Sequence, residues 1–157
     1  MNDVRSSEVP YVDVPTVDVR GPRFAAWVTS AVLALALVLG SGVLVAAQAV
    51  VFAVGAFAGL RFAPYGVLFR VLVAPRLGPP VEREPEAPPR FAQLVGFGFA
   101  VVGAAGYLLG APVLGAIATG LALVAALLNA ATGFCLGCEL YLLVRRALPT
   151  GAPAQTV

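Results

Sequence analysis

The hydrophobic positions of this chain fall in long uninterrupted runs, and the charged positions are confined to short segments between them. Residues 24–60 contain no charged residue, and neither do residues 91–138. Apolar stretches of this length are typical of helices that cross a lipid bilayer. The pattern therefore predicts an all-α fold, a polytopic transmembrane helix bundle in contact with lipid.

The first apolar run is too long for one span. Its 37 residues would extend about 55 Å as a single helix, whereas the hydrocarbon core of a bilayer is about 30 Å thick. Gly40, Ser41 and Gly42 lie near its middle, where glycine permits a tight turn. We therefore expect a helical hairpin with spans over residues 23–39 and 43–60.

The second apolar run predicts another hairpin. Its spans cover residues 91–109 and 113–132, and Gly110, Ala111 and Pro112 form the turn between them. Proline suits the first turn of a helix, where its missing N–H group is not needed. Two hairpins give four spans, within a transmembrane domain of residues 20–146.

The remaining segments are polar or short. Residues 64–77 place Tyr65, Leu68 and Leu72 on one helical face, but 14 residues are too few to span comfortably, so we expect an interfacial helix. Residues 78–90 contain five prolines and three glutamates, which predicts a stiff solvated loop. Residues 1–19 and 147–157 carry no periodic apolar pattern and are expected to be disordered tails.

All ten basic residues are arginine, and the chain has neither lysine nor histidine. This composition excludes a lysine Schiff base, a histidine general base and a metal site built on imidazole. A scattered net charge of +2 does not suggest nucleic-acid binding. The arginines lie in the N-terminal segment, the central loop and the C-terminal segment, and neither hairpin turn has one. The positive-inside rule therefore predicts that both termini and the central loop are cytoplasmic.

The chain has two cysteines, Cys135 and Cys138, and their spacing is informative. Two cysteines placed at random among these positions would stand three apart in only about 1% of cases. On a helix this spacing puts both sulfurs on one face. At the start of a helix the pKa values of the two thiols would be lowered, and at the end of a helix, beside Glu139, they would be lowered less. The sequence does not decide between these two positions.

The position of the pair favours thiol chemistry. Cys135 follows Val113 by 22 residues, or about 33 Å of helix, so it reaches the cytoplasmic boundary. A reducing compartment argues against a purely structural disulfide. Two thiolates are too few for a zinc or iron–sulfur site unless a homodimer supplies the others, so we predict no metal and no cofactor. The alternative is that both cysteines are small apolar core residues.

Several segments together resemble a known family. They are Arg20, residues 59–65 (GLRFAPY), residues 90–93 (RFAQ) and residues 133–141 (GFCLGCELY). In these segments the chain resembles the bacterial membrane proteins of domain-of-unknown-function family 4395 (DUF4395), over about Val17 to Arg146. The resemblance implies a small integral membrane protein of about four spans with no assigned activity. It also implies gene neighbours that encode thioredoxin-like and sulfurtransferase proteins, which are candidate partners.

The leading hypothesis is a cytoplasm-facing thiol redox or sulfur-relay component. Cys135 and Cys138 would alternate as attacking and resolving thiols, and Glu139 would tune them or relay protons. The candidate supporting residues hold the geometry or meet an anionic partner or substrate: Asn129, Tyr141, Arg61 and Arg90. Arg61 and Arg90 have a second interpretation as anchors to lipid headgroups.

Two other classes of function stay open. One is a small carrier or channel subunit for a sulfur-containing solute, which would need to oligomerise. The other is a non-catalytic scaffold that docks a soluble thiol enzyme through the loop at residues 79–89. Gly55 and Gly59, and likewise Gly106 and Gly110, have the spacing of close helix contacts, either within the chain or in a homodimer.

Overall fold

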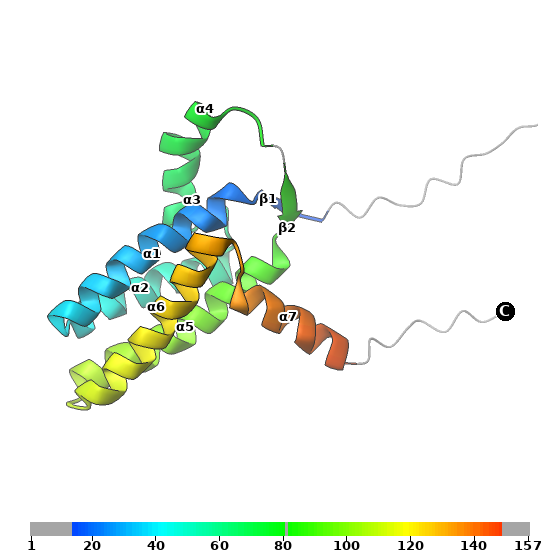
Figure 1. Cartoon of the computed structure of the whole chain (residues 1–157). Coiled ribbons are helices and arrows are strands. Elements are labelled where there is room, and N and C mark those ends of the chain that lie inside the picture. The colour runs from blue at the N-terminus through cyan, green and yellow to red at the C-terminus, as the bar shows by residue number, and fades with distance from the viewer. Residues whose placement is uncertain (1–13, 81, 149–157) are drawn as a thin grey trace, which may run out of the picture.

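A computed structural model describes residues 14–80 and 82–148 of the chain, and helices dominate it (Figure 1). The helices are α1 (Arg20–Leu39), α2 (Gly42–Ala53), α3 (Pro64–Leu68), α4 (Ala74–Leu77), α5 (Ala87–Leu108), α6 (Pro112–Thr132) and α7 (Leu136–Ala147). Two π-helical segments, η1 (Val54–Ala58) and η2 (Phe69–Val73), extend α2 and join α3 to α4. The two strands are β1 (Thr16–Asp18) and β2 (Arg83–Pro85).

Four long helices form a bundle of two hairpins. α2 packs on α5, α5 on α6, α6 on α1, and α1 on α2. Both hairpin turns lie at the same end of the bundle, and α3, α7 and the strands lie at the other (Figure 1). The all-α fold and the two predicted hairpins are therefore confirmed.

The turns form for the reasons that the sequence suggests. Gly40 ends α1 in the left-handed conformation (φ 59°), which glycine adopts without strain. The Ser41 side chain caps α2 by accepting a hydrogen bond from the Leu44 N–H at 3.3 Å. In the second hairpin Gly110 has a φ of 85°, and Pro112 is the first residue of α6.

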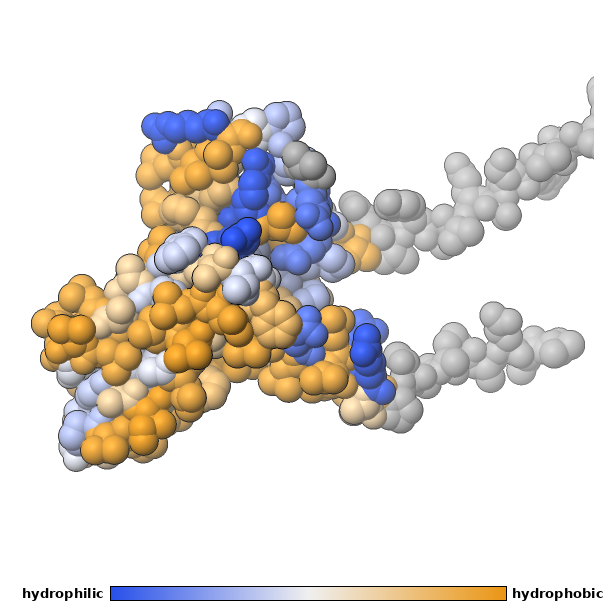
Figure 2. Space-filling model, in the orientation of Figure 1, coloured by the Kyte–Doolittle hydropathy of each residue, from blue (hydrophilic) through white to orange (hydrophobic). Residues whose placement is uncertain are grey.

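The residues inside and outside the bundle are distributed as in a membrane protein. Most buried apolar positions are alanines, such as Ala36, Ala100 and Ala104, which let helices approach closely. Large apolar side chains instead cover the outside, including Val50, Ile117 and Val124, and Figure 2 shows the visible bundle surface as largely hydrophobic. Because water would penalise such a surface, the chain is an integral membrane protein.

In the described part of the chain, three helices are long and apolar enough to cross a membrane, namely α1, α5 and α6. The helix at Gly42–Ala58 is apolar but shorter. Three of the four predicted spans are therefore helices of sufficient length to cross a membrane. Two of the glycines proposed as helix contacts pack within the chain. A Cβ atom on Gly55 would meet Gln93 at 3.0 Å, and one on Gly106 would meet the Gly115 backbone at 2.5 Å. Their partners Gly59 and Gly110 instead have positive φ angles at helix ends.

The strands differ from the tail and the loop expected at these positions. β1 and β2 pair antiparallel, with Val17 opposite Glu84. Residues 16–18 of the expected N-terminal tail therefore form a strand. Residues 1–13 of that tail lie outside the described part of the chain, as do residues 149–157 of the expected C-terminal tail. Neither strand shows an apolar alternation, and their pairing joins segments more than sixty residues apart. Local patterns carry no information on such a contact.

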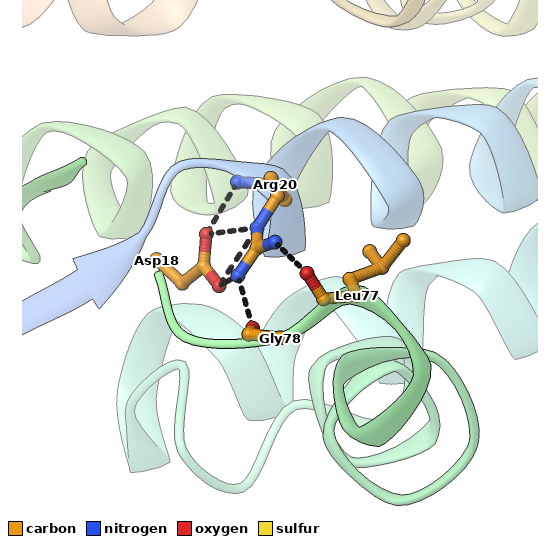
Figure 3. Close-up of polar contacts among 4 residues, drawn as sticks. All are labelled: Asp18, Arg20, Leu77 and Gly78. Carbon is orange, nitrogen blue, oxygen red and sulfur yellow. Dashed lines mark hydrogen bonds and ion pairs between the residues drawn. The ribbon is translucent and has the colours of Figure 1, made fainter. Parts of the chain in front are cut away.

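Arg20 fixes the start of α1 to the end of α4 (Figure 3). Its guanidinium pairs with the Asp18 carboxylate at 2.8 Å and donates to the carbonyl oxygens of Leu77 and Gly78 at 3.3 and 3.2 Å. The hydrogen bond from Arg20 lowers the pKa of Asp18, against the opposing effect of burial. One arginine thus connects β1, α1 and the segment of residues 64–77, which is helical as predicted.

Candidate functional site

Both cysteines lie where the chain turns from α6 into α7. Gly133 ends α6 in the left-handed conformation (φ 78°), and Cys135 is the N-cap residue of α7. Cys138 lies in the first turn of that helix. The helix position that the sequence left open is therefore the start, where the free backbone N–H groups and the helix dipole favour an anion.

Close packing on α5 holds the first turn of α7 in place. A Cβ atom on Gly137 would lie 2.5 Å from the Ala92 Cβ atom and 2.6 Å from its Cα atom, so only glycine fits at this contact. One turn later the Tyr141 ring packs on the Phe91 ring with centroids 5.7 Å apart. Gly137, one of the two residues between the cysteines, therefore serves the contact of α7 with α5.

The cysteines line a cleft of about 800 Å³ between α1, α5, α6, α7 and β2. Its lining includes many apolar residues and reaches Phe52 in the bundle. The polar and titratable residues that line it are Arg23, Thr29, Glu82, Glu84, Gln93, Asn129 and Glu139. Both cysteines are free thiols and half-buried, so they border the cleft without being sealed in the core.

The two thiols have different acidities. The Cys138 thiol, followed by the backbone N–H groups of Cys138 and Gly137, lowers the pKa of Cys135 to about 7, and burial opposes this effect. The interaction with Cys135, burial and the charges of Glu84 and Glu139 raise the pKa of Cys138. Cys135 is thus the more readily ionised thiol.

The structure brings some of the predicted site residues together and separates others. Glu139 and Asn129 line the cleft with the cysteines. Tyr141 packs behind them, and its hydroxyl accepts a hydrogen bond from Arg145 at 3.3 Å. Arg61 and Arg90 are not among the residues that line the cleft.

The two arginines have structural contacts at other positions. The Arg61 guanidinium lies 4.6 Å from the centre of the Phe62 ring. Arg90 donates to the Ala56 carbonyl oxygen at 3.0 Å, near the end of η1. Arg23 acts similarly on α6, where it donates to the carbonyl oxygens of Ala130 and Ala131 at 3.4 Å. Arg23 and Arg90 thus satisfy carbonyl groups at the ends of neighbouring helices.

Sequence reasoning missed Glu84. The sequence placed it in a solvated loop, whereas β2 holds it half-buried at the cleft. Burial, followed by the charge of Glu82, raises the pKa of Glu84. No sequence signal marks this residue, because its place depends on the pairing of β2 with β1.

Within residues 14–80 and 82–148, no group of three or more Cys, Asp or Glu side chains is arranged to hold a metal ion. The chemistry that this arrangement can perform is that of a dithiol beside carboxyl groups.

Comparison with known proteins gives a family for the chain. The family described as "Domain of unknown function (DUF4395)" matches residues 17–146. The chain therefore belongs to this family, and the matched region contains all seven helices, both strands and both cysteines. No curated protein and no solved structure matches the chain.

Proposed function

We propose that this DUF4395 protein is a membrane-bound dithiol that exchanges electrons with a soluble thiol protein through Cys135 and Cys138. The observation that carries the proposal is the place of Cys135 at the start of α7, on an open cleft, with its pKa lowered to about 7. A thiol with this pKa is partly ionised at neutral pH, and the thiolate is the nucleophile in exchange.

The reaction is a thiol–disulfide exchange in two steps. The Cys135 thiolate attacks one sulfur of a partner's disulfide, and the other partner sulfur leaves as a thiolate. Cys138 then loses its proton and attacks the Cys135 sulfur, which releases the second partner thiolate. The chain ends with a Cys135–Cys138 disulfide, and the partner has gained the two electrons. Run in reverse, the same steps oxidise the partner.

The proposed setting is the bacterial inner membrane, with four spans and both termini in the cytoplasm. The described arginines lie at the end of the bundle opposite the hairpin turns, and this distribution supports a cytoplasmic location of that end. As the fourth span, the helix of residues 42–58 would measure about 25 Å. This is only slightly shorter than the hydrocarbon core, and local thinning of the bilayer accommodates such a difference. The cysteines would then face the compartment of thioredoxin-like and sulfurtransferase proteins, the proposed partners.

Thiol trapping tests the proposal. Full-length protein in lipid nanodiscs should lose two reactive thiols together under mild oxidation and regain both with a dithiol reductant. In cells, Cys138→Ala should accumulate a mixed disulfide between Cys135 and a thioredoxin-like protein, whereas Cys135→Ala should accumulate less. If both thiols resist maleimide in the folded protein and react only after denaturation, they are packing residues, and the scaffold function takes the place of the redox function.

A carrier function makes a different prediction for the same cysteines. The apolar depth of the cleft, which reaches Phe52, is the observation that favours it. Proteoliposomes that hold the purified protein would then take up a small sulfur-containing solute such as thiosulfate. Uptake that persists in the Cys135→Ala, Cys138→Ala double variant would favour a carrier over a dithiol.

A further inference from the structure

The β1–β2 pair brings a carboxyl group from the central segment to the cysteines. Glu84 is the middle residue of β2 and lies opposite Val17 in β1. Its side chain is half-buried and lines the same cleft as Cys135 and Cys138. It is close enough for its charge to raise the pKa values of both thiols. Strand pairing thus gives the thiol pair a neighbour that lies more than fifty residues away in the sequence.

Resolution of a mixed disulfide needs a proton acceptor in this cleft. Once Cys135 is bonded to a partner sulfur, Cys138 must lose its proton before it can attack. Burial and the charges of Glu84 and Glu139 hold Cys138 in its protonated form. Free ionisation would place a second negative charge beside a carboxylate in a partly apolar cleft, which is costly.

The other charged groups around the cleft are less suited to accept this proton. Glu82 and Glu139 are exposed, and Arg23 cannot act as a base because its guanidinium stays protonated. Glu84 is the half-buried carboxyl group among them. Burial and Glu82 raise its pKa, and a raised pKa makes a carboxylate a better base near neutral pH.

We propose that Glu84 is the general base for Cys138 in the resolving step, an inference that rests on the proposed dithiol function. The Cys138 proton moves to the Glu84 carboxylate as the Cys138 sulfur forms its bond to Cys135. The bond between Cys135 and the partner sulfur breaks, and the partner leaves as a thiolate. The proton then passes from Glu84 to water. Because the negative charge moves from Glu84 to the leaving sulfur, the resolving step forms no Cys138 thiolate beside the Glu84 carboxylate.

A two-phase reaction with dithiodipyridine separates the steps. This small neutral disulfide releases one coloured thiopyridone when Cys135 attacks it, and a second when Cys138 resolves the adduct. In full-length wild-type protein in nanodiscs, both phases should appear. In Glu84→Gln we expect an unchanged first phase and a second phase slowed by about a hundredfold at neutral pH, the lower range for loss of a general base.

Two further variants control the experiment. Glu84→Asp keeps a carboxylate and should recover part of the rate of the second phase. If the slow second phase of Glu84→Gln came only from a change in fold, Glu84→Asp would be slowed as well. Glu139→Gln removes an exposed negative charge that raises the pKa of Cys138, so its second phase should become faster. A second phase slowed in Glu139→Gln and not in Glu84→Gln would make Glu139 the base and overturn the inference. The second phase of wild type should also accelerate as the pH rises through the pKa of a carboxyl group, and Glu84→Gln should lack this rise.

The opposite result has a clear meaning. If Glu84 acts only through its charge, its removal lowers the pKa of Cys138, and the second phase becomes faster. An unchanged or accelerated second phase in Glu84→Gln therefore overturns this inference and leaves the dithiol function standing. A wild-type protein that shows neither phase overturns both.

Discussion

Two cysteines in the same helical turn acquire different properties from their surroundings. Cys135 precedes the first helical residue, where the Cys138 thiol and backbone N–H groups stabilise its thiolate. Cys138 lies within the turn, beside the Cys135 sulfur and two carboxyl groups. This difference suits a pair in which Cys135 attacks and Cys138 resolves.

The acidity of Cys135 predicts its reaction with alkylating reagents. A thiol with a pKa of about 7 should be alkylated at half its maximal rate near that pH. In Cys138→Ala, the group that contributes most to the lowered pKa is lost, so the midpoint for Cys135 should move upward, towards the ordinary thiol value. Rates of iodoacetamide labelling between about pH 5 and pH 10 measure the midpoint, with peptide mass spectrometry to identify the residue. A midpoint that is unchanged in Cys138→Ala would contradict the role of Cys138.

At the scale of elements, the first turn of α7 is held against α5 by the close contact at Gly137. In Gly137→Ala the new Cβ atom would lie 2.5 Å from the Ala92 Cβ atom, so α7 must shift. Overpacking of this kind costs about 1–3 kcal/mol, which exceeds the helix propensity that alanine gains over glycine. We expect a lower melting temperature in detergent and faster maleimide labelling of Cys138.

Gly120→Ala in α6 is the matched control for this change. Open space surrounds the position of its Cβ atom, so the gain in helix propensity should leave the melting temperature equal or higher. Equal effects of the two substitutions would show that α7 is not held by the contact at Ala92.

The sequence predicted the elements whose cause is local. The turn at Gly40 and Ser41, the start of α6 at Pro112 and the helix that begins at Pro64 all follow from residues within a few positions of each other. The ends of the predicted spans accordingly agree with α1, α5 and α6 to within four residues. The sequence did not predict the type of helix, because nothing in the pattern indicated that η1 and η2 adopt π-helical geometry.

The candidate site was predictable only in part, because half of it depends on contacts distant in sequence. The spacing of Cys135 and Cys138 indicated a thiol pair, and Glu139 and Asn129 follow from their closeness in the chain. Glu84 reaches the cleft only because β2 pairs with β1. Arg90, a candidate to meet an anionic partner or a lipid headgroup, donates to a carbonyl near the end of η1. Tertiary packing determines whether an arginine binds a carbonyl oxygen, a carboxylate or a lipid headgroup.

Two helical segments extend outward from the arginine-rich end of the bundle (Figure 1). One runs from α3 through η2 to α4, and the other is α7. Leu136, Leu140 and Leu143 form an exposed stripe along α7, at the spacing of one helical face. Arg145 and Arg146 follow in its last turn. An exposed apolar stripe with a basic end is typical of a helix that lies in the membrane interface.

A depth scan tests this arrangement. Spin labels placed singly along residues 136–147 should report a depth in the bilayer that oscillates with a period of about 3.6 residues, deepest near Leu140 and Leu143. The same oscillation is expected along residues 64–77, with Leu68 and Leu72 among the deeper positions. A depth that changes steadily along either segment would instead mean that the segment crosses the membrane.

At the scale of the whole molecule, the distribution of arginines predicts the topology. The arginine-rich end, with the thiol cleft, should face the cytoplasm, and the two hairpin turns should face outward. In a background with Cys135→Ser and Cys138→Ser, a membrane-impermeant maleimide should label Ser41→Cys and Ala111→Cys in intact cells. Glu82→Cys, in the exposed segment before β2, should be labelled only after the membrane is permeabilised.

The second turn makes this experiment a test of four spans as well as of orientation. If the helix of residues 42–58 did not cross the membrane, α1 would still place Ser41 outside, and the chain would stay outside until α5. Three crossings would put residue 82 and residue 111 on opposite sides from those expected for four. Labelling of Ser41→Cys and Glu82→Cys from outside, with Ala111→Cys protected, would therefore establish three spans with a cytoplasmic N-terminus. Cys135 and Cys138 would then lie outside, in a compartment where a disulfide is the stable form.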